Sequence, residues 1–591
     1  MAPAGRGYRK CRSRWRFGSV TFLAPFSDSG YLHPVTDPSP SASLRALPSI
    51  DQVLARPAIR ALEAALGRAI LKAAARDAVA AARERLRRSA SRPGVTATEP
   101  SDAVAPASSE APLVSDADVL ALALRAAAPS LRPVLNATGI PLHTNLGRAP
   151  LHPEAVAQVA AIAAGYSSLE LDLESGKRGH RADHVEPILC ALFGAEAAFA
   201  VNNCAAATML GLAAAGAGIA AVVSRGELVE IGGGFRVPDI LRQSGVRLIE
   251  VGTTNKTRLA DYAAALDALG ATEAAALASA GSGAPPPALL LRVHRSNFAL
   301  VGFTAAPSLA ELAQLARARG VRLLHDLGSG AAASPAAAGL PHEPTARDSL
   351  EAGADLVMCS GDKLLGGPQS GLLLGARALV DGCRTHPLAR ALRLDKLLLA
   401  ALEATLRLHL AGRGAEVPAL AALGATVEAL EARAVRLLFL LHARGLACRV
   451  VASEGRVGGG SLPLVKLVSR AVSLDPPPGI AASALAAELR RGCLALPRGV
   501  SPETGQALAR RGFGEPRLPV LARVHDGAVL LDVRCVPECE IPTLAEAAAA
   551  AIGRLRARDT GATSGPTIGF IAEGIAAPRD FAATLGGEEE V

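Results

Sequence analysis

The chain has 591 residues and a mass of 60.0 kDa, and 50% of its residues are hydrophobic, which excludes wholesale disorder and leaves ample chain for several domains. Its 62 Lys and Arg exceed its 54 Asp and Glu by a net charge of +8, which is modest for this length. The nine cysteines are scattered, so we expect a cytoplasmic protein without a disulfide framework or a structural metal site. Residues 205–223 carry no charge, but their Ala and Gly content predicts a buried helix and strand rather than a membrane span.

The chain begins with a segment rich in Ser, Pro and Arg, and we expect residues 1–42 to form a disordered basic tail. A helical N-terminal domain is expected over 43–90. Ser49 and Gln52 form a capping-box pattern there, and apolar residues recur every three or four positions from 59 to 70.

This N-terminal segment holds most of the net charge. Residues 45–92 contain eleven Lys and Arg against four Asp and Glu. Such a surface is either an ordinary solvated helix face or a contact surface for a phosphate backbone, and composition leaves both interpretations open.

The rest of the chain divides by pattern. Residues 91–115 are rich in Pro, Ser and Thr, as in a flexible linker. Apolar strand-like runs alternate with helical patterns over 116–410, which predicts an α/β domain with a mostly parallel sheet and helices on both faces. We expect a smaller α+β domain over 411–555 and a loose tail over 556–591, and 281–288 is typical of a loop insertion.

Lys363 follows directly on an apolar run that ends at Ser360, and it precedes a pair of glycines. Ligands of open α/β sheets bind beyond the carboxyl ends of the strands, and glycine lets a cofactor approach the backbone closely. A lysine at that place is suited to form a Schiff base with pyridoxal 5′-phosphate (PLP), with Ser360 beside the cofactor. A surface lysine in a turn is the alternative.

Two further segments agree with a PLP site. Asp326 ends an apolar run 37 residues before Lys363, and PLP requires a carboxylate at its ring nitrogen. Asn202 and Asn203 stand between another strand and a helix of small residues, whose N-terminus could bind the cofactor phosphate. The alternatives are an aspartate that caps a turn and asparagines that cap a helix.

Eight segments in order carry a resemblance to a known family, the bacterial selenocysteine synthases (L-seryl-tRNA(Sec) selenium transferases), which are PLP enzymes of fold type I. They are NATGIPLHTNLGRAPL (136–151), YSSLELDLESGKRGHR (166–181), SRGELVEIGGGFRVPDIL (224–241), VGTTNKTRLADY (251–262), HRSNFALVGFT (294–304), DLGSG (326–330), SGDKLLGGPQSG (360–371) and LARALRLDKLLLAALEATLRL (388–408).

The resemblance implies a role for several residues. Lys363 would be the Schiff-base lysine, and Asp326 would face the pyridine nitrogen. Arg148, Arg390 and Arg393 match arginines that line the active site and bind the oxyanion of the selenium donor, which suits planar guanidinium groups. For Arg390 and Arg393, spacing alone favours surface ion pairs with Asp395 or Glu403.

The resemblance also implies the reaction and its partners. The enzyme would convert L-seryl-tRNA(Sec) to L-selenocysteyl-tRNA(Sec) with selenophosphate, by β-elimination through an aminoacrylyl-tRNA intermediate and subsequent selenium addition. The amine of Lys363 would be the base for the Cα proton, and the sequence does not identify the acid for the departing hydroxyl. The N-terminal domain would recognise tRNA by shape, and the protein would assemble as a homodecamer, without DNA or membrane partners.

The chain departs from the family pattern at Cys204, His180 and His325, and we expect none of these to touch Lys363, Asp326 or the three arginines. The extra length near 497–517 receives no function. One alternative is a related PLP lyase that acts on a small amino or sugar acid, against which the basic N-terminal domain argues. Another is an RNA-binding protein without catalysis, against which the intact lysine, aspartate and arginines argue.

Overall fold

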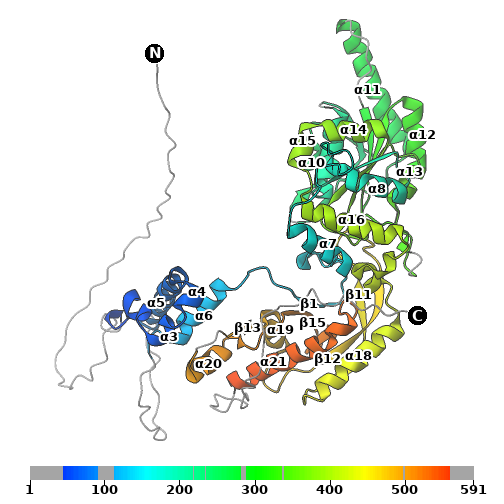
Figure 1. Ribbon diagram of the computed structural model, residues 1–591. Helices are drawn as coiled ribbons and strands as arrows, with labels where there is room; N and C mark the ends of the chain where they lie inside the picture. The colour runs from blue at the N-terminus through cyan, green and yellow to red at the C-terminus, as the bar shows by residue number, and fades with distance from the viewer. Residues whose placement is uncertain are drawn as a thin grey trace, which may run out of the picture.

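The computed structural model describes residues 44–90, 112–216, 218–232, 234–280, 288–335, 339–496 and 500–559. They form an N-terminal helical module, an α/β domain and a C-terminal α+β domain (Figure 1). The expected tail over 1–42, most of the linker, the insertion up to residue 287 and the end of the chain beyond 559 lie outside the described residues.

Among the described residues, the N-terminal module contains helices α2 to α6, which share an apolar core. The predicted capping box is confirmed, since the Ser49 side chain accepts from the backbone N–H of Gln52 and Gln52 accepts from that of Ser49. The helices are α2 (Ile50–Leu54), α3 (Pro57–Arg60), α4 (Glu63–Leu66), α5 (Arg68–Ala90) and α6 (Asp116–Ala127).

Helix α6 belongs to the N-terminal module, whereas we expected residue 116 to begin the α/β domain. Leu120 and Val119 of α6 are buried in the same core as Leu71 of α5. The local pattern showed a helix here, but only tertiary packing decides which domain buries its apolar face.

A segment of the C-terminal domain holds the module in place. Leu508 of α20 (Pro502–Ala509) and Phe513 of β14 (Phe513–Gly514) are buried in the core of the module. Arg511 donates to the carboxylate of Asp118 at 2.7 Å, and the guanidinium of Arg125 lies 5.7 Å from the centre of the Phe513 ring. No function was assigned to the extra length near 497–517, and its described part, 500–517, thus docks one domain on another.

The α/β domain contains a seven-stranded sheet in the order β2-β10-β9-β8-β7-β3-β6, with β10 antiparallel to both neighbours and the other pairs parallel. Helices cover both faces, as predicted (Figure 1). The strands are β2 (Ala197–Val201), β3 (Ala220–Ser224), β6 (Arg247–Val251), β7 (Ala288–Val293), β8 (Arg322–Gly328), β9 (Leu356–Ser360) and β10 (Gly371–Gly375). A small hairpin joins β4 (Glu230–Gly232) to β5 (Phe235–Arg236).

The surrounding helices are α7 (Pro153–Ala163), α8 (Glu186–Phe193), α9 (Cys204–Ala215), α10 (Val237–Gln243), α11 (Leu259–Ala280), α12 (Leu309–Arg319), α13 (Ala346–Glu351), α14 (Arg377–Thr385), α15 (Pro387–Ala391) and α16 (Lys396–Leu410). The uncharged stretch 205–223 forms most of α9 and β3, as predicted. Within the described parts of the chain, no helix is both long and apolar enough to cross a membrane.

The C-terminal domain contains a five-stranded sheet in the order β1-β15-β16-β12-β11. Its first strand, β1 (Leu135–Ala137), comes from the chain ahead of the α/β domain and pairs in parallel with β15. The other elements are β11 (Cys448–Arg456), β12 (Lys466–Leu474), β13 (Leu494–Ala495), β15 (Val520–His525), β16 (Ala528–Asp532), α17 (Pro418–Leu423), α18 (Val427–His442), α19 (Ala482–Arg491) and α21 (Ile541–Asp559).

Candidate active site

Lys363 lies three residues beyond the end of β9, where the sequence predicted a ligand site, and only 5% of it is exposed. Glycines from both domains surround its amine. A Cβ added at Gly460 would lie 2.6 Å from Nζ, and one added at Gly328 would lie 3.8 Å from it. Both glycines have positive φ, so side chains are disfavoured at these positions for conformational reasons as well. The surface-lysine alternative is therefore wrong.

Asp326 lies in β8, in register with Met358 of the neighbouring β9, and is 7% exposed. Burial raises its pKa to about 6, although Thr208, Lys363 and Cys204 act in the opposite direction. A buried carboxyl with a raised pKa lacks a full counter-charge.

The expectation that Cys204 does not touch Asp326 is wrong, because the two side chains are in contact. Its Sγ donates to Oδ1 of Asp326 at 3.8 Å. Burial raises the pKa of this thiol well above its ordinary value, so Cys204 stays protonated and is no nucleophile. His325 agrees with expectation, since its ring pairs with the hydroxyl of Ser349.

Asn202 and Asn203 stand at the N-terminus of α9. Oδ1 of Asn203 accepts from the backbone N–H of Ala206 at 2.8 Å, so Asn203 is a helix cap. The backbone N–H of Asn202 donates to the carbonyl of Leu392 at 2.9 Å. Ser360 is buried at the end of β9, on the carboxyl side of the sheet that also carries Lys363. A phosphate role for these residues stays a prediction.

Arg148 is held next to the lysine by an ion pair. Its Nη1 lies 2.5 Å from Oδ2 of Asp362, the residue before Lys363. Arg148 has a φ of 62°, which is uncommon for a residue with a side chain, and its backbone N–H donates to the carbonyl of His143.

Arg390 and Arg393 lie elsewhere in the chain, at the edge of the sheet beside β2. They line a cavity of about 450 Å³ together with Arg181 and Glu170, and Arg148 does not line it. Nη1 of Arg393 is 3.9 Å from Glu170.

The ion pairs that spacing favoured for these arginines are not the ones that form. Asp395 instead caps α16, and Glu403 pairs with Arg407.

A second cavity of about 390 Å³ is lined in part by Gly460, the glycine next to the amine of Lys363, and two chain segments supply most of its lining. Residues 143–145 form one wall and 456–460 the other. They are joined by hydrogen bonds from the backbone N–H of Leu142 to Val457 and from Gly459 back to Leu142. Sequence reasoning missed the second wall, because its glycines follow a strand of a different domain.

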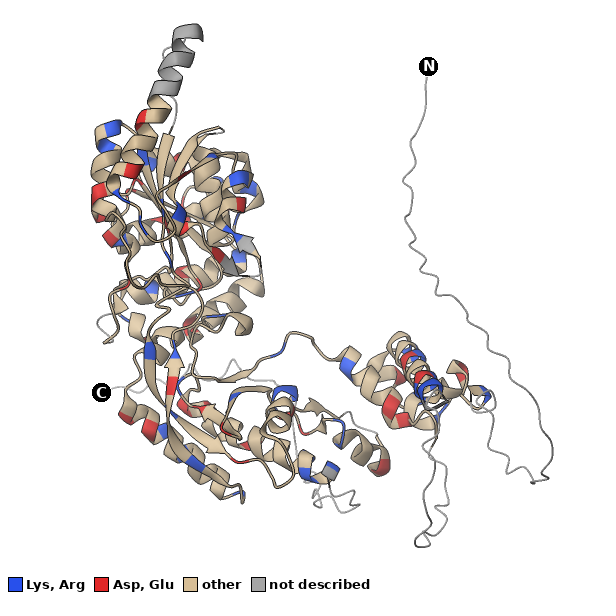
Figure 2. Ribbon diagram, turned by 180° about the vertical axis from the view of Figure 1, so that it is seen from behind, with Lys and Arg blue, Asp and Glu red and all other residues tan. Residues whose placement is uncertain are grey.

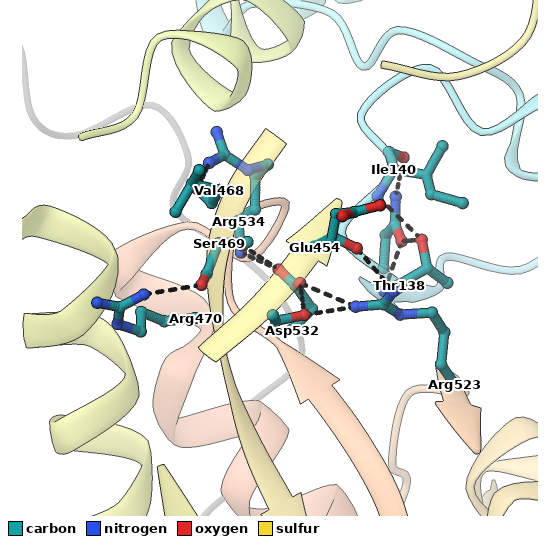
Figure 3. A network of polar contacts seen from close by, with 11 residues as sticks. Thr138, Ile140, Glu454, Val468, Ser469, Arg470, Arg523, Asp532 and Arg534 are labelled. Atoms are coloured by element: carbon teal, nitrogen blue, oxygen red, sulfur yellow. Dashed lines mark hydrogen bonds and ion pairs between the residues drawn. The ribbon is translucent and has the colours of Figure 1, made fainter. Parts of the chain in front are cut away.

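A buried carboxylate fixes these walls (Figure 3). Asp532 is fully buried and accepts from the hydroxyls of Ser453 and Ser469, each at 2.8 Å, and from Arg523 at 3.2 Å. Gly139 packs over this carboxylate, and a Cβ there would lie 2.5 Å from Oδ2. The network thus anchors the loop that leads into the cavity.

The residues present suit PLP. A buried lysine and a buried carboxyl without a full counter-charge stand on adjacent strand ends, glycines leave space at the amine, and a capped twelve-residue helix begins nearby. This fold and this site together define an α/β enzyme of the PLP-dependent class.

The comparisons with known proteins narrow that class to one family. The family model "L-seryl-tRNA selenium transferase" matches residues 134–497, and the model "Selenocysteine synthase N terminal" matches 44–83. The chain belongs to this family, whose members are PLP-dependent.

Two named relatives of the same family match most of this chain. An L-seryl-tRNA(Sec) selenium transferase of Hyphomonas neptunium is 46% identical over 71% of this chain and 82% of its own length. One of Methylocella silvestris is 42% identical over 85% and 96%. Among solved structures, D-glucosaminate-6-phosphate ammonia-lyase is 19% identical, with a TM-score of 0.47 over 71% of this chain and 96% of its own.

Proposed function

We propose that this chain converts L-seryl-tRNA(Sec) to L-selenocysteyl-tRNA(Sec) with selenophosphate as the selenium donor. The observation that carries the proposal is that family models match both the catalytic part, 134–497, and the N-terminal helices, 44–83. A lyase for small molecules would need the first match only.

PLP, when bound, supplies an electron sink for negative charge at the Cα of the seryl group. Lys363 holds the cofactor and then takes the Cα proton at Nζ. Asp326 keeps the ring nitrogen protonated. The positive charge on that nitrogen is in turn the counter-charge that the buried carboxyl of Asp326 lacks. Asn202, Asn203 and Ser360 bind at the phosphate end, where the N-terminus of α9 attracts an anion.

Selenophosphate is assigned to Arg148, Arg390 and Arg393, because guanidinium groups pair well with tetrahedral oxyanions. Asp362 orients Arg148 by its ion pair. Arg390 and Arg393 line a cavity that Arg148 does not reach within one chain. A homo-oligomer, for which the family resemblance suggests ten copies, offers a way to complete the site with arginines of two chains.

The tRNA is assigned to the helical module, where exposed cations of α5 include Lys72, Arg76 and Arg83. Figure 2 shows that both Lys or Arg and Asp or Glu positions occur along the helices of this module. The deep major groove of an RNA helix is closed to side chains, so contacts to its phosphates and shape are expected. We expect the reaction to take place in the cytoplasm.

The test is turnover of serine-charged tRNA(Sec) with selenophosphate, with free serine in parallel. Selenocysteine formed on the tRNA alone is the expected result. Reaction of free serine, with no product on the tRNA, would contradict the proposal and favour a lyase for small amino or sugar acids.

A further inference from the structure

Arginines gather where the C-terminal domain docks on the N-terminal module, away from the Lys363 centre. They come from the C-terminal ends of α19 and α21, from the segment 510–517 after α20, and from the chain in and after α6. We call this set the junction patch. It consists of Arg125, Arg132, Arg490, Arg491, Arg510, Arg511, Arg517, Arg554 and Arg558.

Hydrogen bonds from guanidinium groups to backbone carbonyls bring these segments together. Nη2 of Arg125 donates to the carbonyl of Arg511 at 3.1 Å. Nη2 of Arg132 donates to the carbonyl of Arg491 at 3.3 Å. The short strands β13 and β14 pair in parallel, which joins the end of α19 to the segment after α20. The patch is therefore one continuous region built from both domains.

A buried carboxylate holds three of these arginines. Glu488 of α19 has a fully buried side chain, which accepts from Arg554 at 2.6 Å and from Arg558 and Arg491, each at 2.8 Å. Nε of Arg558 also donates to the carbonyl of Arg510 at 2.8 Å, so this cluster reaches the segment after α20. Three guanidinium groups on one carboxylate leave two positive charges without a counter-charge.

The whole patch keeps an excess of positive charge. Besides the carboxylate just described, Asp118 pairs with Arg511. Arg517 pairs with Glu515 and Glu546. Among the described residues, nine arginines therefore have four carboxylates as ion-pair partners. The C-terminal ends of α6, α19, α20 and α21 contribute about half a negative charge each, so an excess of about three positive charges remains.

Two arginines of the patch are left for a partner outside the chain. Arginines near helix C-termini commonly bind the last carbonyls, and several members of the patch do so. Arg490 and Arg510 are exposed, and their side chains make no hydrogen bond or ion pair with any of the described residues. Stabilisation of the helix ends therefore does not account for these two guanidinium groups.

We propose that the junction patch is a second contact surface for RNA, which binds backbone phosphates of the tRNA held by the N-terminal module. The inference rests on the proposed function, because it takes tRNA as the partner. Guanidinium groups pair well with phosphate oxygens, and the module lies directly against the patch. The segment 500–517 lies beyond both family matches, 44–83 and 134–497, so the family models do not account for this surface.

The experiment measures the affinity of the full chain for uncharged tRNA(Sec) at several salt concentrations. Arg490→Ala together with Arg510→Ala removes two phosphate contacts. Binding is expected to weaken by about 10-fold, and the slope of log affinity against log salt should decrease by about two. Arg490→Lys together with Arg510→Lys keeps both charges and should retain most of the slope. The melting temperature should change in neither variant, because these side chains have no partner to lose among the described residues.

Arg444→Ala together with Arg449→Ala is the matched control, since both are exposed arginines of the same domain outside the patch. Its affinity and salt slope should stay close to those of the unchanged chain. An unchanged slope in the alanine pair, an equal loss in the control, or an equal loss in the lysine pair would overturn the proposal. Selenium transfer that fails while these binding results hold would contradict the proposed function alone. Intact transfer with an unchanged slope would contradict the junction patch alone.

Discussion

The Lys363 centre and the N-terminal helical module both concentrate charge, but they place it differently. Lys363 and Asp326 are buried between strand ends, whereas Lys72, Arg76 and Arg83 project into solvent. Buried charges act strongly over a few ångströms, while exposed ones act over about a Debye length and are screened by salt. One substitution should therefore disable the first region, and only a set of substitutions should disable the second.

The largest effect is expected for Lys363→Ala. Turnover should fall by about 10⁴-fold or more, because both the attachment of PLP and the proton acceptor are lost. The visible absorbance of bound PLP should disappear as well. Lys466→Ala, which removes only an exposed ion pair with Glu454, is the control. A surviving absorbance band would place the Schiff base at another lysine.

The next largest effect is expected at the contact that docks the N-terminal module on the C-terminal domain. Phe513→Ala is expected to cost about 3–5 kcal/mol, because the ring is buried in the core of the module and stacks under Arg125. Thermal unfolding and faster hydrogen exchange in α6 would report the loss. Phe439→Ala on α18 is the control, since that ring is 72% exposed. Equal effects of the two changes would show that Phe513 does not dock the module.

The raised pKa of Asp326 should make the free energy of unfolding depend on pH. The pKa of Asp326 rises from 3.8 to about 6 on folding, so the folded state binds more protons between these values and loses stability as the pH rises through 6. The loss for the protein without PLP should be roughly 3 kcal/mol. Asp326→Asn should abolish it in denaturant titrations, and Asp239→Asn should not. A persisting loss in Asp326→Asn would assign it to another group.

The smallest effect is expected from the exposed cations. Replacing Lys72, Arg76 and Arg83 together by Ala should weaken tRNA binding by about 10- to 100-fold and lower the salt dependence by about one per lost phosphate contact. The PLP absorbance should not change. Binding measured at several salt concentrations decides the matter, and an unchanged salt slope would mean that α5 presents only a solvated face.

Much of the site could be predicted because its signals are local. Asp326 and Lys363 each follow an apolar run, and a strand end on the carboxyl side of a parallel sheet is where ligands bind. The cap at Asn203 and the glycines after Lys363 are likewise visible within a few residues.

What the sequence could not show depends on contacts between distant segments. Gly460 reaches the lysine from another domain. Cys204 was expected to stand apart, yet the start of α9 brings its sulfur to Asp326. The spacing of residues along the chain does not show which distant segments come into contact.

The strand β1 has a consequence for how the chain is made. Leu135 pairs with Val520, so about 380 residues must leave the ribosome after it before its partner exists, which takes tens of seconds at 5–20 residues per second. Helix α6 likewise lacks its packing partner Phe513 until that residue has been synthesised. Two early segments therefore stay without their final partners while the α/β domain between them can already form. Translation order thus makes the five-stranded sheet the last large element to close, and leaves β1 in need of protection from foreign edges until then.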